Sequence, residues 1–382
     1  MALLLNNLAV LYKTQGKYAT AEQLYQRALH IREQILGPEH PDVAQSLHNL
    51  ANLRVRLSQY TEAEQFYQRA LHIREQVFGS ENPDIAQNLL CLAILYHRQG
   101  RYNEAERLYQ QILQMYEREP GTPLLSTASC LGALANLYVI QGRYHEANPL
   151  YQRALQIYQQ ELGPLHPSVA QSLDNLANLL ADWGKCEEAE SLYRKALHIR
   201  EQKLGPLHPD VAQSLNNLAT LFCQEGKYAE AEPLYLRALD IREQVLGQEH
   251  PETASSLNNL ASLYTEQGKY AEAQQLFQRA LHIRERVLGS DHPDTANTLF
   301  DFAMLWQAQE SYEEARSFYE RALTLLIRTL GSAHPYTIDA RRRLRAVLVA
   351  MGKTEEAALL DATQPETAGN GTATNKESGR EQ

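Results

Sequence analysis

The sequence predicts an all-α fold in which antiparallel helix hairpins stack into a solenoid. The length of 382 residues, with 44% hydrophobic and 21% charged residues, fits a folded repeat array as well as a few globular domains. Three observations favour the array: one residue pattern recurs at constant spacing, its apolar residues follow helical periodicity, and glycine or His-Pro punctuates it. The clearest row, 42 residues apart, is Ala9, Ala51, Ala93, Ala135, Ala177, Ala219, Ala261 and Ala303.

Other rows keep the same register without a gap over about 350 residues. One contains alanines, namely Ala21, Ala63, Ala105, Ala147, Ala189, Ala231, Ala273 and Ala315. Another contains tyrosines, namely Tyr25, Tyr67, Tyr109, Tyr151, Tyr193, Tyr235 and Tyr319. Alanine lets helix axes approach, and tyrosine fills the wedge between neighbouring hairpins, so we expect both rows in the core between units.

Each unit is expected to contain two helices. In one unit, apolar residues recur with helical spacing over residues 211–222, Gly226 is a stop signal, and a second helix runs from about 229 to 246. His250-Pro251 then begins the next hairpin, since proline suits a first helical turn. Breaks between units are expected near Gly37, Gly79, Gly121, Gly163, Gly205, Gly247, Gly289 and Gly331.

At these positions the chain resembles the tetratricopeptide repeat. The matching residues are Leu218, Ala219, Phe222, Ala231, Tyr235 and Ala238. The 42-residue unit, with Leu-Asn-Asn-Leu-Ala and Arg-Ala-Leu-x-Ile-Arg-Glu, is similar to the repeats of kinesin light chains and their bacterial relatives. The resemblance implies a right-handed superhelical solenoid of about eight full units plus a C-terminal capping helix. First helices would line its concave face.

We expect the solenoid to span residues 1–361 and residues 362–382, which have no large apolar side chain, to form a disordered tail. The arginines of residues 341–345 would be the polar outer face of the capping helix, or alternatively an anion-binding patch. Met1 opens inside a repeat helix, with no coiled coil before it. This favours a stand-alone or truncated array of the bacterial kind over attachment to a motor.

Several function classes are disfavoured. The net charge of −10 argues against nucleic-acid binding, and no apolar run of 18 residues predicts a membrane span. No catalytic or cofactor motif occurs, so we expect no enzyme activity, no cofactor and no small-molecule substrate. The turn histidines recur once per unit, too far apart to share a metal ion, so a structural role is expected. Four widely spaced cysteines suit the cytoplasm.

Polar residues at i and i+4 positions predict a peptide-binding groove along the first helices. The groove residues are Gln45, Asn49, Asn52, Gln171, Asn175, Asn178, Gln213, Asn217, Thr220, Ser255 and Asn259. Amides that donate and accept together suit the backbone of an extended peptide. The alternative, left open for the Asn49 position, is that these asparagines hold neighbouring helices together.

The third and fourth units depart from the pattern and predict a selective pocket. Groove asparagines become Cys91 and Ala133, and the His-Pro turn becomes residues 120–123. The pocket residues are Arg56, Leu90, Ile94, Arg98, Val139 and Ile140. Apolar side chains beside two guanidiniums suit an aromatic anchor next to an acidic residue, as in the tryptophan-acidic peptides of kinesin light chains. The alternative is sequence drift.

Two functions remain open at this stage. The first is an adaptor or scaffold that binds another protein or peptide in its groove. The second is an architectural or regulatory arm of a signalling or effector assembly that grips no linear motif.

Overall fold

The computed structural model describes residues 1–79, 82, 85–118, 124–332 and 334–362, and these contain helices and no strand. The first helices of nine successive units are α1 (Ala2–Thr14), α3 (Pro41–Arg56), α5 (Ala86–Arg98), α7 (Leu124–Ile140), α9 (Pro167–Asp182), α11 (Pro209–Gln224), α13 (Pro251–Glu266), α15 (Pro293–Ala308) and α17 (Pro335–Ala350). The second helices are α2 (Tyr18–Leu36), α4 (Tyr60–Phe78), α6 (Tyr102–Arg118), α8 (Tyr144–Leu162), α10 (Cys186–Leu204), α12 (Tyr228–Val245), α14 (Tyr270–Val287), α16 (Tyr312–Leu330) and α18 (Thr354–Ala362). The predicted all-α array of helix hairpins is confirmed.

The His-Pro pair starts a helix by capping it. His40 lies at the N-cap of α3, and its Nδ1 accepts a hydrogen bond of 3.1 Å from the backbone N–H of Asp42. Pro41 follows at the first helical position, where a backbone N–H would have no partner. Before the pair, Gly37 has φ +88°, a conformation that strains residues with a Cβ. The expected break near Gly121 lies outside the described residues.

The alanine and tyrosine rows form the core, as expected. All eight alanines of the row beginning at Ala9 and all eight of the row beginning at Ala21 have no exposed surface. Tyr25, Tyr109 and Tyr319 are at most 1% exposed. Consecutive helices pack against each other along the whole array.

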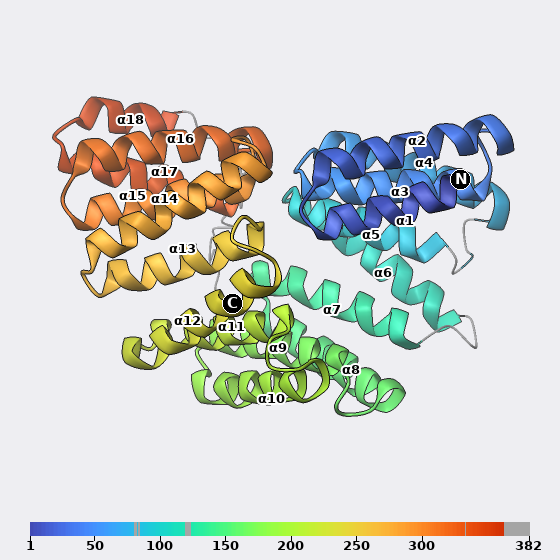
Figure 1. Ribbon diagram of the computed structural model, residues 1–382, viewed down its shortest axis with the longest axis horizontal. Coiled ribbons are helices and arrows are strands. Elements are labelled where there is room, and N and C mark those ends of the chain that lie inside the picture. The colour runs from blue at the N-terminus through green and yellow to red at the C-terminus, as the bar shows by residue number, and fades with distance from the viewer. Residues whose placement is uncertain (80–81, 83–84, 119–123, 333, 363–382) are drawn as a thin grey trace, which may run out of the picture.

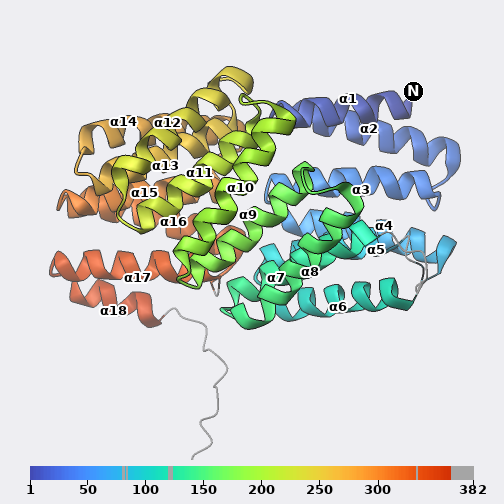
Figure 2. The same cartoon turned by 90° about the horizontal axis from the view of Figure 1, so that it is seen from below.

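The superhelix brings the two ends of the array together. In Figure 1 the middle units, α7–α12, lie below the N-terminal and C-terminal units, and Figure 2 shows the same arrangement from below. His292 at the start of α15 has its Nε2 2.8 Å from the carbonyl oxygen of Arg56 at the end of α3, 236 residues away in sequence. Units one to three therefore contact units seven to nine.

The last unit is a shortened hairpin, because a helix of nine residues, α18, follows the expected capping helix α17. In α17, Arg341 is buried, and Arg342 and Arg343 both pair with Asp339. Of the clustered arginines, one is thus buried and two form ion pairs within their own helix. The expected tail, apart from its first residue, lies outside the described residues.

Candidate functional site

The first helices line the inner side of the superhelix. Those of adjacent units contact one another directly from α5 to α15, whereas contacts between adjacent second helices are fewer among the described residues. Helices on the inner side of a curved array are closer together, so this difference places the first helices on the concave face. Figure 1 shows α10 at the lower edge of the molecule and α9 nearer the middle.

A row of arginines on the second helices, most of them buried, bonds to the first helices that line this face. Arg200 of α10, which is 2% exposed, donates to Gln171 Oε1 (2.9 Å) in its own unit and to Ser214 Oγ and the Asp210 carbonyl in the next. It also pairs with the carboxylate of buried Asp174. Equivalent arginines make equivalent bonds across four other joins between units, namely Arg32, Arg74, Arg242 and Arg284. Each arginine therefore joins two units.

The arginines decide which end of each amide in the predicted groove accepts a hydrogen bond and which end donates one. A guanidinium can only donate hydrogen bonds, so the Oε1 of Gln213 must accept from Arg242 (2.8 Å). The Nε2 of Gln213 then donates to Asn217 Oδ1 (2.8 Å). The same chain runs from Arg200 through Gln171 to Asn175, with a Gln171–Asn175 bond of 3.0 Å. In both chains the Oδ1 atom of the asparagine is used as an acceptor, so its Nδ2 group is the last donor of the chain.

The polar stripe differs from unit to unit. In the second unit, Gln45 donates to Asn49 (3.4 Å), and Asn49 donates onward to Asn6 of α1 (2.7 Å). The Asn49 amide therefore joins neighbouring helices, which is the alternative left open by the sequence. In the seventh unit, Ser255 accepts from Arg284 at 3.1 Å. Asn259 is half-buried at the position equivalent to Asn217.

The remaining stripe residues bind the tyrosines of the core. Asn52 Oδ1 accepts from the hydroxyl of Tyr67 at 2.7 Å. Asn178 accepts from the Tyr193 hydroxyl in the same way, and Thr220 Oγ1 lies 2.8 Å from the Tyr235 hydroxyl. One acceptor at each of these positions is thus used inside its own hairpin, while the side chains of Asn178 and Thr220 remain exposed.

Four of the predicted pocket residues line one cavity. Ile94, Arg98, Val139 and Ile140 surround a space of about 650 Å³. Its opposite wall comes from the C-terminal units and includes Asp294, Asn297, Leu330, His334 and Tyr336. Leu90 takes no part: it is 8% exposed and packs in the core at the repeat position of Asp174 and Asn216, which faces the neighbouring unit. The expected groove position of Leu90 is therefore corrected.

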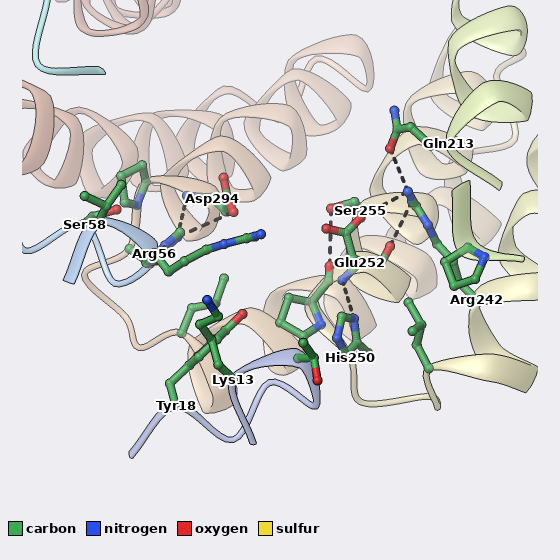
Figure 3. A pocket seen from close by; sticks show the side chains of 18 of the residues that line it. Lys13, Tyr18, Arg56, Ser58, Gln213, Arg242, His250, Glu252, Ser255 and Asp294 are labelled. Atoms are coloured by element: carbon green, nitrogen blue, oxygen red, sulfur yellow. Dashed lines mark hydrogen bonds and ion pairs between the residues drawn. The ribbon is translucent and has the colours of Figure 1, made fainter. Parts of the chain in front are cut away.

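Arg56 lines a second cavity of about 560 Å³, which Arg98 also borders. Figure 3 shows Lys13, Tyr18 and Arg56 of the N-terminal units with Asp294 beside Arg56, and His250 and Glu252 across from them. Burial and the charge of Arg56 lower the pKa of Lys13. Among the described residues, no carboxylate forms an ion pair with Lys13, Arg56 or Arg98, although the carboxylates of Asp210, Glu252 and Asp294 line the same cavity.

The turn histidines are helix caps. Nδ1 of each accepts from the backbone N–H two residues on, at 3.0–3.3 Å, in His40, His166, His208, His250, His292 and His334. Within the described residues, no three His, Cys, Asp or Glu side chains are grouped so as to hold a metal ion. None of the described helices combines the length and the apolar character that crossing a membrane requires.

The arginine row was not predicted, although the sequence carries a signal for it. Arg32, Arg74, Arg200, Arg242 and Arg284 share one repeat position, and the serine, asparagine or threonine that each contacts follows 14 residues later. The signal is the paired register of the arginine and the small polar residue, because exposed arginines such as Arg69 and Arg237 recur at the same spacing as well.

Comparisons with known proteins agree with this architecture. The family model described as "Tetratricopeptide repeat" matches residues 1–76, 84–160, 126–202, 210–286, 252–326 and 303–361. No curated protein matches the chain.

Solved structures resemble parts or most of the chain. BtubC (BKLC) from P. vanneervenii is 26% identical, with a TM-score of 0.49 over 61% of this chain and 94% of that one. The TPR-like repeats of a putative kinesin light chain from Podosopora anserina are 27% identical, with a TM-score of 0.43 over 54% of this chain and 97% of that one. A Rap protein complexed with Competence and Sporulation Factor is 16% identical, with a TM-score of 0.53 over 92% and 99%. At this identity the Rap likeness shows a shared fold alone.

Proposed function

Because the chain belongs to the tetratricopeptide repeat family, we propose that it is a non-catalytic scaffold that binds another protein through an extended segment in its concave groove. The observation that carries the proposal is the pair of directed chains from Arg200 and Arg242 to Asn175 and Asn217. The last groups of these chains are N–H donors at equivalent positions in adjacent units. Donors repeated at this spacing suit the backbone carbonyl groups of an extended peptide, whatever its sequence.

Anchoring the chains on guanidinium groups also strengthens this interpretation. A donor at the end of a chain of hydrogen bonds is polarised by the bonds behind it, and it is held in one orientation before a ligand arrives. Less conformational entropy is then lost on binding. The Rap protein of the same fold, which is complexed with Competence and Sporulation Factor, indicates that such a superhelix can hold a ligand.

The two cavities suit a selective part of the partner. The larger one has apolar walls at Ile94, Val139 and Ile140, and Arg98 borders both this cavity and the one around Lys13 and Arg56. An aromatic side chain in the first cavity would place a neighbouring acidic side chain beside the unpaired cations. The preferred partner is therefore a protein segment that contains an aromatic residue next to an acidic one.

A displayed library of random peptides, selected on the immobilised protein, tests the proposal. Asn175→Ala/Asn217→Ala/Asn259→Ala should weaken the affinity of the enriched peptides at least several-fold, because each lost neutral hydrogen bond is worth about 0.5–1.5 kcal/mol. The matched control removes three amides from exposed positions on second helices, in Gln26→Ala/Gln68→Ala/Gln110→Ala, and should bind normally.

A second arm uses Arg56→Glu/Arg98→Glu. Peptides that combine an aromatic with an acidic residue should lose binding to this variant, and neutral peptides should keep it. Full binding by the asparagine variant would refute the groove, and so would lost binding accompanied by much earlier melting. If the wild-type protein enriched no peptides at all, the architectural role without a linear ligand would be favoured.

A further inference from the structure

Units one and seven meet at a histidine. The ring of His250, at the start of α13, lies beside the turn that follows α1. Beside it, a β-carbon placed on Gly16 would lie 3.5 Å from Cδ of Pro251 and 3.8 Å from Cδ2 of His250, which is ordinary contact distance. The turn between α1 and α2 therefore lies against the start of α13.

The same contact recurs one unit further along on both sides. His292 Nε2 lies 2.8 Å from the carbonyl oxygen of Arg56, which is the residue equivalent to Thr14. In the third pair, a β-carbon on Gly100 would lie 3.6 Å from Cδ2 of His334. Three successive units of the N-terminal end thus meet three successive His-Pro turns of the C-terminal end, always six units on.

The chemistry of His292 shows why a histidine suits both tasks. Its Nδ1 accepts from the backbone N–H of Asp294 at 3.0 Å, so the proton of the neutral ring is on Nε2. Nε2–H then donates to the Arg56 carbonyl, an acceptor at the C-terminal end of α3. One imidazole therefore caps α15 and also joins it to a helix 236 residues away.

Apolar residues complete the seam. Val287 and Leu288, at the end of α14, pack against the core of the first two units, which includes Ala9 and Tyr18. Both candidate cavities also straddle the seam. The cavity at Arg56 has walls from units one to three and six to eight, and the cavity at Ile94 has walls from units two to four and from units eight and nine. They exist only while the two ends of the array are in contact.

We propose that His250, His292 and His334 form a latch that closes the superhelix and completes the two cavities. Release of the latch would separate the N-terminal and C-terminal units and take the cavity walls apart, while every hairpin stayed folded. Peptide binding in the groove belongs to the proposed function, whereas the latch is read out by the shape of the protein without ligand. The two can therefore fail independently.

Replacing the histidine with asparagine separates its role as a helix cap from its contact with the other end of the array. Asparagine is among the best N-cap residues, so His→Asn retains the helix start, but its shorter side chain does not reach across the seam. The seam variant is His250→Asn/His292→Asn/His334→Asn. The matched control is His40→Asn/His166→Asn/His208→Asn, which replaces three histidines with the same capping bond away from the seam.

Small-angle X-ray scattering on the full chain measures the outcome, with circular dichroism as the check on helix content. The seam variant should show a larger radius of gyration and maximum dimension at unchanged helicity, and the control should scatter like the wild type. Unchanged scattering of the seam variant, or equal expansion of both variants, would overturn the latch. If the triple variant lost helicity, His292→Asn would decide by the same criteria.

Discussion

Arg200→Met removes a buried charge that holds two units together. Its effect on the free energy of unfolding depends on the Asp174 carboxylate, which loses its cation. The side chains of Arg200 and Asp174 are 3% and 1% exposed, and they lie 2.5 Å apart. Methionine fills similar space but leaves the carboxylate of Asp174 without its cation. Breaking a buried ion pair from one side costs about 3–5 kcal/mol, and we expect a loss in this range from the free energy of unfolding.

The neighbouring unit supplies the comparison. Arg242 occupies the same repeat position, but it faces the neutral Asn216 where Arg200 faces Asp174, and its partner Glu252 is 44% exposed. Arg242→Met therefore strands no buried charge. Its expected cost is about 3 kcal/mol, from its three hydrogen bonds to Gln213, Ser256 and the Glu252 carbonyl at about 1 kcal/mol each, which is the lower end of the range for Arg200→Met.

A double variant isolates the stranded charge. Asp174→Asn restores the residue type found at the same position in the next unit, and Arg200→Met/Asp174→Asn should recover about half of the loss caused by Arg200→Met. The cost of Arg200→Met should also shrink as the pH falls toward about 6, because the Asp174 carboxyl of the variant takes up a proton at a higher pH than that of the intact protein. Burial already raises the pKa of Asp174 to about 6 in the intact protein, and losing the nearby guanidinium raises it further.

Urea unfolding followed by circular dichroism measures these differences, and amide hydrogen exchange in α9–α11 localises them to the affected units. Equal destabilisation by Arg200→Met and Arg242→Met would refute the reasoning, as would a double variant no more stable than Arg200→Met alone. Either result would mean that the Asp174 charge is not what the arginine compensates.

Two further predictions concern stability. Glu310 has φ +60° at a turn position that holds glycine in most units. Glu310→Gly should therefore raise the free energy of unfolding, measured by urea unfolding, by about 1 kcal/mol. No gain would mean that the side chain of Glu310 compensates for the backbone strain. His48 is buried and His97 is half-buried, and desolvation lowers the pKa of each from 6.5 to about 4. The folded state disfavours their charged forms, so stability present above pH 6.5 should be lost as the pH falls toward 4, on the order of 3 kcal/mol per histidine. Replacing His97 with glutamine should flatten the measured pH dependence, and an unchanged slope would contradict this assignment.

Most of the local structure could be predicted because it repeats. The 42-residue spacing, the His-Pro caps and the glycines at the unit ends act within one hairpin. The sequence therefore holds six His-Pro pairs and eight glycines in one register, and these copies support one another. The alanine and tyrosine rows were placed in the core for the same reason. Residues such as Leu90 were misplaced because a helix has two buried sides here, one toward its own hairpin partner and one toward the next unit.

The groove was predicted as a stripe of amides, but the donor and acceptor ends of their hydrogen bonds depend on a residue from another helix. Gln213 and Asn217 alone can bond either way round, and only the donor Arg242 decides which of the two amides donates to the other. Such a contact joins residues 29 apart in sequence, and periodicity along one helix does not report it.

The closure of the superhelix belongs entirely to the tertiary structure. Each unit is rotated and shifted only slightly from the one before, and that rotation depends on how large and small side chains pack at every join. Six joins accumulate before Arg56 meets His292, so a small change in the packing angle of each would separate them. Local patterns in the amino-acid sequence therefore specify the hairpins, while the summed geometry of their packing decides that the two ends meet and enclose the cavities.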